Sequence, residues 1–126
     1  MGINSRGDLL ERLWEHDKDT TYLAKGDYLA SLEGWRIEPH EVDGQLVGIT
    51  ITKGSEFHFV TLGLKWGLRR SDIRQYLEPL IKEFGCVTTR TPKDDSRQQR
   101  FNKILGFVPV GEDEFYIHFR LEHLCL

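Results

Sequence analysis

The chain has 126 residues and a mass of 14.7 kDa, which predicts one domain over residues 1–126, because domains most often contain roughly 100–150 residues. A net charge of −3 argues against general affinity for nucleic acids or membrane surfaces. Cys86 and Cys125 are too few and too far apart to indicate a disulfide framework or a zinc site. No apolar run is long enough for a membrane span or a secretion signal, so we expect a cytoplasmic protein.

Two short helices are predicted ahead of the first strand. Apolar residues recur at helical spacing from about Asp8 to Asp17, with Asp8 as the candidate cap. A second helix is predicted over Asp27–Leu32, and Gly34 ends it. Neither helix carries a chemical motif, so we expect both to cover one face of a sheet.

A three-stranded antiparallel meander is predicted next. Its first two strands, Trp35–Val42 and Gln45–Thr52, are separated only by Asp43 and Gly44. That dipeptide favours a type I′ hairpin turn, in which both central residues have positive φ. A tight connection then leads into Glu56–Leu62, which is rich in β-branched and aromatic residues and is therefore predicted to be the third strand.

An amphipathic helix follows the meander. Ser71 and Asp72 are predicted to cap its start, and Gly85 is predicted to end it. Pro79 is expected to kink or restart this helix, because an interior proline loses a hydrogen bond. The predicted apolar face consists of Ile73, Leu77, Leu80, Ile81 and Phe84.

The start of this helix is a candidate anion site. Basic side chains crowd it, from Lys65, Arg69, Arg70 and Arg74. A helix N-terminus offers unpaired amides and the positive end of the helix dipole, both of which favour an anion. The alternative interpretation is a solvated basic edge, since short basic runs are common on protein surfaces.

The remaining elements are a strand, a helix and two strands. Cys86–Arg90 is predicted to lie parallel to the strand before the central helix, joined to it by a right-handed crossover. The last helix is capped within Asp94–Ser96 and stopped by Gly106, and its apolar face is expected to comprise Phe101, Ile104 and Leu105. The final strands are Phe107–Val110 and Phe115–Leu121.

The stretch Arg100–Phe107 reads Arg-Phe-Asn-Lys-Ile-Leu-Gly-Phe. Together with the order of the elements, it resembles the GNAT superfamily of acetyl-CoA-dependent N-acetyltransferases, whose helix-ending signature is Arg-Phe-Tyr-x-x-Leu-Gly-Phe. The resemblance covers about Asp8 to Glu122. It implies an α+β fold: a central mixed, mostly antiparallel sheet with helices on both faces. Nothing in residues 1–7 matches the usual first strand, so we expect that strand to be missing.

The resemblance also implies acetyl-CoA as the cofactor of an active member. The family's pyrophosphate loop, Gln/Arg-x-x-Gly-x-Gly/Ala, aligns with the candidate cofactor-binding residues Arg69, Arg70, Ser71, Asp72, Ile73 and Arg74. Asp72 and Arg74 stand where the family has small residues. A carboxylate at Asp72 would repel a pyrophosphate, and both side chains add bulk where the cofactor should approach the main chain.

The candidate catalytic residues are Glu56, His58 and Asn102. Glu56 and His58 lie where the family often keeps a general base; the alternative is a paired surface glutamate and an ordinary strand histidine. Asn102 replaces a family tyrosine that protonates the departing thiolate, and an amide cannot act as an acid at neutral pH. A third group, His118, His123 and Cys125, has only weak metal-ligand spacing, and we expect no metal site.

Three functions remain open. The first is a non-catalytic interaction or assembly module with a protein partner, similar to degenerate GNAT-like proteins of bacteriophages that act in the virion or in host takeover. The second is a divergent N-acetyltransferase. The third, less favoured by the acidic balance, is a nucleic-acid-binding module that uses the Lys65–Arg74 edge. The apolar segment Leu121–Leu126 and an exposed sheet edge also favour a homo-oligomer.

Overall fold

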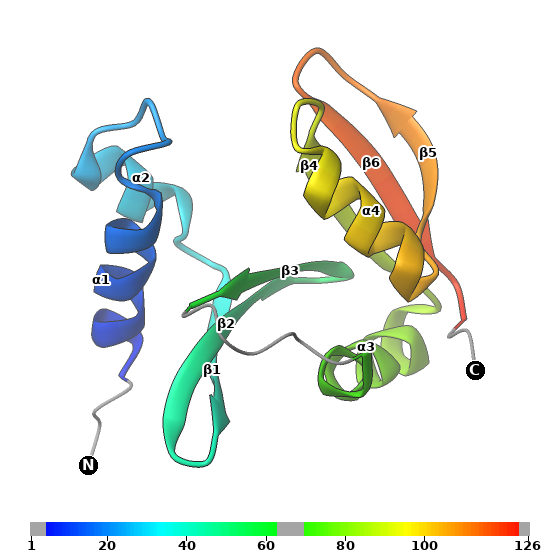
Figure 1. The fold of residues 1–126 in the computed structure, drawn as a ribbon, viewed down its shortest axis with the longest axis horizontal. Helices are drawn as coiled ribbons and strands as arrows, with labels where there is room; N and C mark the ends of the chain where they lie inside the picture. The colour runs from blue at the N-terminus through cyan, green and yellow to red at the C-terminus, as the bar shows by residue number, and fades with distance from the viewer. Residues whose placement is uncertain (1–4, 63–69, 124–126) are drawn as a thin grey trace. The chain divides into compact units, whose positions relative to one another are not determined.

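The computed structural model describes residues 5–62 and 70–123, and Figure 1 shows its elements. Their bounds are α1 Arg6–Asp17, α2 Lys25–Ser31, β1 Arg36–Val42, β2 Gln45–Lys53, β3 Glu56–Thr61, α3 Arg70–Phe84, β4 Val87–Pro92, α4 Ser96–Leu105, β5 Val108–Glu112 and β6 Tyr116–Leu121. The strands follow the order β1-β2-β3-β4-β6-β5 in one sheet. This arrangement confirms the predicted α+β class with a mixed, mostly antiparallel sheet. The described residues form two compact units, 5–53 with 58–62 and 54–57 with 70–123.

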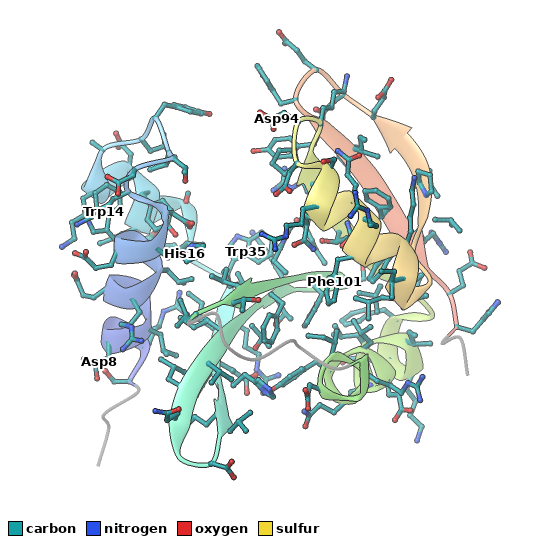
Figure 2. All side chains as sticks on the ribbon, in the orientation of Figure 1. Asp8, Trp14, His16, Trp35, Asp94 and Phe101 are labelled. Carbon is teal, nitrogen blue, oxygen red and sulfur yellow. The ribbon has the colours of Figure 1, made fainter. Side chains whose placement is uncertain are left out.

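The first helix of the first unit starts earlier than its sequence suggested. Ser5 is the N-cap of α1, and its side chain accepts a hydrogen bond from the backbone N–H of Asp8. The Asp8 carboxylate in turn accepts from the Ser5 backbone N–H, which completes a capping box. The prediction that Asp8 itself caps the helix is therefore wrong, because Asp8 is the third helical residue and serves the cap from inside (Figure 2).

Apolar residues from both helices and the hairpin strands build the core of the first unit. Its buried members are Leu9, Leu13, Tyr28, Ile37, Ile49, Ile51 and Leu62. Trp14 packs edge-on against Tyr28, with ring centroids 5.4 Å apart (Figure 2). Within this unit the helices cover one face of the hairpin, as predicted, because the burial of their apolar stripes removes that surface from water.

The hairpin turn has the predicted geometry. Asp43 and Gly44 both have positive φ, 52° and 78°, and the flanking residues Val42 and Gln45 pair directly. This is the backbone pattern of the type I′ turn. Further along β2, Gly48 lies against the Phe59 ring, so closely that a Cβ built there would lie 2.4 Å from the nearest ring carbon.

The second unit is organised around β4. Its first residues pair in parallel with the start of β3, at Glu56 and Thr88, as predicted for the crossover through α3. On its other side β4 pairs antiparallel with β6. Alternate residues of β4 are buried, so one face of the strand belongs to the core and the other is exposed.

The central helix differs from its prediction at its start and in its middle. It begins at Arg70, so Ser71 and Asp72 lie inside its first turn and are not its cap. It runs through Pro79 to Phe84 as one element, so the proline does not restart it. Its end is as predicted: Gly85 has a φ of 80°, and its N–H donates to the Ile81 carbonyl at 2.8 Å.

Both ends of α4 confirm the sequence signals, but one residue of its predicted apolar face, Ile104, does not lie in the core. The Asp95 side chain accepts from the backbone N–H of Gln98 at 3.0 Å, and Gly106 has a left-handed φ of 105°. Ile104, predicted to face the core, is 50% exposed. The buried residue of this helix is the polar Asn102.

The core of the second unit lies on one face of its strands. Its buried apolar members are Phe57, Ile73, Leu77, Cys86, Val87, Phe107, Phe119 and Leu121. The Tyr76 ring of α3 stacks on Phe57 with centroids 6.3 Å apart, and Figure 1 shows α4 alongside β4 and β6. Among the described residues, none of the helices has both the length and the apolar character that a bilayer-spanning helix needs.

Replacing Gly48 by alanine is expected to destabilise the first unit by about 1–3 kcal/mol, because the new methyl group would overlap the Phe59 ring and crowd the Val60 carbonyl oxygen, 3.1 Å away. Chemical denaturation measures this change. The matched control is Gly26→Ala in α2, where a Cβ meets nothing within 4 Å. Equal stability of the two variants would contradict the close packing at Gly48.

Candidate functional site

A pocket of about 370 Å³ opens in the second unit. Its lining residues come from four strands: Glu56 of β3, Thr88–Arg90 of β4, His118 and Phe119 of β6, and Val110 of β5. Arg90 and His118 pair directly across β4 and β6. The pairing therefore brings together two side chains that are 28 positions apart in the sequence.

An ion pair occupies one side of this pocket. The Arg90 Nε donates to Glu56 Oε2 at 3.1 Å. The Arg90 guanidinium carbon also lies 5.5 Å from the centre of the Tyr116 ring, within the range of a cation–π contact. Glu56, a candidate base from the sequence, is thus a half-buried carboxylate paired with an arginine, as the alternative interpretation of this residue expected.

His118, a further lining residue, is paired with the carboxylate of Asp113, which does not line the pocket. His118 Nε2 lies 2.8 Å from Asp113 Oδ2. The other carboxylate oxygen, Oδ1, accepts from the backbone N–H groups of Phe115 and Tyr116 at 2.9 and 2.8 Å. The hydrogen bond from His118, followed by these two backbone donors, lowers the pKa of Asp113 to about 2.

Asp113 was not among the site residues predicted from the sequence. An aspartate in a turn between two strands typically accepts hydrogen bonds from the backbone two and three residues later, and Asp113 lies between β5 and β6, directly after Glu112. That signal was available. The contact with His118 also depends on the register in which β5 and β6 pair, and no local sequence pattern predicts that register.

His58, the other candidate base, belongs to the first unit. Its ring lies 5.8 Å from the Trp35 ring at an interplanar angle of 58°. Glu56, two residues earlier, belongs to the second unit. The structure thus describes His58 as a partly buried strand histidine against an aromatic ring.

Asn102 lies in the interior, away from solvent. It is 3% exposed, its Nδ2 donates to Thr91 Oγ1 at 2.8 Å, and its Oδ1 accepts from Gln98 Nε2 at 2.9 Å. Both ends of the amide are therefore engaged between α4 and β4. At the position where the family has its acid, this chain has a hydrogen-bonded link inside the core.

The candidate cofactor-binding stretch is described in part. Arg69 and the side chains of Arg70 and Ser71 lie outside the described residues. Ile73 is fully buried, so it offers only its backbone. Asp72 and Arg74 are half-buried in the first turns of α3. The start of this helix therefore presents a carboxylate where a glycine would let a phosphate reach the main chain, and any phosphate held there depends on arginine side chains.

No group of three metal-ligating side chains could hold an ion within residues 5–62 and 70–123. Of the weak metal set from the sequence, His118 is bound to Asp113 and Cys125 lies outside the described residues. Cys86 is buried and free, as expected of a small apolar residue.

The fold is shared with solved N-acetyltransferases. The chain is similar to the Campylobacter jejuni N-acetyltransferase PseH in complex with acetyl coenzyme A, with a TM-score of 0.69 at 13% identity, covering 95% of this chain and 94% of that chain. It is also similar to a dodecameric spermidine N-acetyltransferase from Vibrio cholerae (TM-score 0.69, 12% identity, 94% and 90% covered) and a ribosomal-protein-alanine N-acetyltransferase from Brucella melitensis (0.67, 11%, 94% and 97%).

The chain has a GNAT-like fold. The expectation drawn from Arg100–Phe107 and the element order is thereby confirmed at the level of fold. No family model matches the chain, and no curated protein sequence matches it. Among the described residues of this GNAT-like fold, no strand precedes α1.

Asn102→Ala is expected to destabilise the fold by about 1–3 kcal/mol, because the buried Thr91 hydroxyl loses its donor. Asn102→Tyr, which restores the family residue, should destabilise as well, because the ring has no space between α4 and β4. Chemical denaturation tests both, with Lys103→Ala on the exposed side of α4 as control. A stable Asn102→Tyr variant would contradict the structural role.

The Asp113 carboxylate gives a pH-dependent contribution to stability. Its folded pKa of about 2 lies below the ordinary value of 3.8, so its contribution is fully present above pH 4 and is lost as the pH falls through 2. In Asp113→Asn this loss should be missing. Thermal unfolding midpoints measured from pH 5 to 2 compare the two proteins, and parallel curves would contradict the assignment.

Proposed function

We propose that the chain, acting as a single domain, transfers an acyl group from acetyl-CoA to a primary amine. The observation that carries this proposal is the pocket at the start of the parallel β3–β4 pairing, lined by Glu56, Arg90 and His118. Such a pocket, in which ionisable side chains are combined with the apolar Val110 and Phe119, is the usual form of an active site. Solved proteins with this fold include N-acetyltransferases, one of them in complex with acetyl coenzyme A.

The loss of the family's acid at Asn102 is compatible with this chemistry. A thiol has an ordinary pKa of about 8.5, so a thiolate leaves at neutral pH at a cost of about 2 kcal/mol relative to its protonated form. A primary ammonium has a pKa of about 10.4, and its deprotonation at pH 7 costs about 4.6 kcal/mol. Removal of the amine proton is therefore the larger demand on the protein, and an enzyme of this kind depends more on its base than on its acid.

Acetyl-CoA would supply the acyl group as a thioester. Arg69, Arg70 and Arg74 are the side chains proposed to hold its phosphates. Because Asp72 adds a negative charge in the same turn, we expect weaker binding than a glycine-lined loop gives.

The cofactor is tested by calorimetry. The wild type is expected to bind acetyl-CoA and CoA with a Kd in the micromolar range, and Arg69→Ala combined with Arg70→Ala should weaken binding at least about tenfold, because charge-assisted contacts to phosphate are lost. The matched control removes two exposed arginines of α4, Arg97→Ala with Arg100→Ala, and should bind normally. Undetectable binding by the wild type at millimolar acetyl-CoA would refute acyl transfer.

That negative result would favour a second candidate, a non-catalytic module that binds a protein partner in the cytoplasm or in a phage virion. The burial of Asn102 and the carboxylate of Asp72 are the observations in its favour, because both remove groups that an acetyl-CoA site uses.

Under either function we propose a homo-oligomer; one solved protein with this fold, the Vibrio cholerae enzyme, is dodecameric. Size-exclusion chromatography with light scattering measures the oligomeric state.

A further inference from the structure

Backbone hydrogen bonds hold the carboxylate of Asp113 in place independently of its contact with the imidazole of His118. Two backbone N–H groups hold Oδ1, and the Asp113 N–H donates to the Tyr116 carbonyl at 2.9 Å, which closes the turn between β5 and β6. Oδ2 is thereby directed at His118 Nε2, 2.8 Å away. The pair is 49% and 41% exposed, and a simple surface ion pair of this kind would contribute little to stability.

This geometry selects one tautomer of His118. An ionised carboxylate can only accept hydrogen bonds, so Nε2 carries the proton and the neutral ring keeps a lone pair on Nδ1. Within the described part of the chain, Nδ1 has no hydrogen-bond partner. An imidazole oriented by a carboxylate, with its second nitrogen unprotonated, is the arrangement of a general base.

His118 also lines the pocket in which the amine is proposed to bind. The charged groups around it are Glu56 and Arg90 from β3 and β4, Asp113 from the turn, and the neighbouring pairs Lys93–Glu112 and Arg120–Glu122. Glu56 is the competing base, but its carboxylate is bound to Arg90. Carboxylates are also ordinarily far weaker bases than imidazole, whose ordinary pKa lies closest to neutrality.

We propose that His118 accepts the proton of a primary ammonium group bound in this pocket and that Asp113 is its positioning residue, an inference that rests on the proposed acyl transfer. The ammonium N–H bond breaks, a new N–H bond forms at Nδ1, and the nitrogen keeps the electron pair that makes it a nucleophile. The imidazolium that results lies against the Asp113 carboxylate, which stabilises its charge.

Kinetics with acetyl-CoA and a panel of primary amines (butylamine, spermidine and the peptide amide Ala-Gly-Gly-NH₂) test the assignment. His118→Gln keeps a donor for Asp113 and should fold normally, while kcat falls at least about 100-fold with little change in KM. His118→Ala should lose a similar factor and regain at least about tenfold activity in 50 mM imidazole, which a structural role could not produce. Asp113→Asn should lower kcat about tenfold. The control variant is His123→Ala, which removes an exposed histidine outside the pocket and should leave kcat unchanged.

Full activity of His118→Gln, or a His118→Ala variant that imidazole does not rescue, would overturn the assignment. A second measurement needs no turnover. In side-chain ¹H–¹⁵N spectra of the wild type without acetyl-CoA, His118 should be the Nε2–H tautomer, and its Nδ1 resonance should move when butylamine is added at constant pH but stay unchanged with N-butylacetamide. An Nδ1–H tautomer or an unmoved resonance counts against the proposal.

The two hypotheses fail in different ways. If the wild type binds no acetyl-CoA, acyl transfer is refuted, and the spectra still decide whether His118 meets amines. If the wild type binds the cofactor and acetylates an amine while His118→Gln does so equally well, acyl transfer stands and only the assignment of the base is lost.

Discussion

The hydrogen bond between Asn102 and Thr91 determines which face of the second unit can carry chemistry. It joins α4 to β4 inside the core, at 2.8 Å and with both residues nearly inaccessible to solvent. A buried amide left without partners would cost about 1–3 kcal/mol, more than the net contribution of one hydrogen bond, so this link also specifies how α4 packs on the strand. Because α4 packs against that face, the side chains of Thr88 and Arg90 stand on the other face of β4, and both residues line the pocket.

This division explains why the sequence evidence conflicted. The motif from Arg100 to Phe107 marks how a helix ends and a buried strand begins, and packing alone is enough to maintain it. Asn102 lies inside the motif, but its side chain is hydrogen-bonded in the core. The asparagine at the position of the signature's tyrosine is therefore explained by how α4 packs on β4 and needs no catalytic role. The ionisable pocket residues Arg90 and His118 lie outside the motif, on strands whose pairing brings them together.

Local signals predicted the fold well, and long-range pairing limited the prediction of the site. Asp43-Gly44, Gly85 and Gly106 all have positive φ, which the residue types favour, so their positions could be predicted. Asp95 could be predicted because its side chain caps the helix. Helix starts were harder to predict, because several polar residues near an end can each serve as a cap. For α1, Asp8 was predicted to be the cap, whereas the cap is Ser5. The contact between Asp113 and His118 depends on the conformation of one turn and on the register between two strands. The periodicity of apolar residues in the sequence predicts neither of these.

The placement of charge around the pocket bears on the proposed proton transfer. Among the described residues of the lining, the single carboxylate, Glu56, is bound to Arg90, so these two charges cancel. Asp113 does not line the pocket, and its carboxylate contacts Nε2 of His118. In the proposed reaction the neutral ring becomes an imidazolium, and the Asp113 charge would then stabilise it. That interaction would grow as the proton moves, and only an interaction that is stronger in the transition state than in the ground state accelerates a reaction.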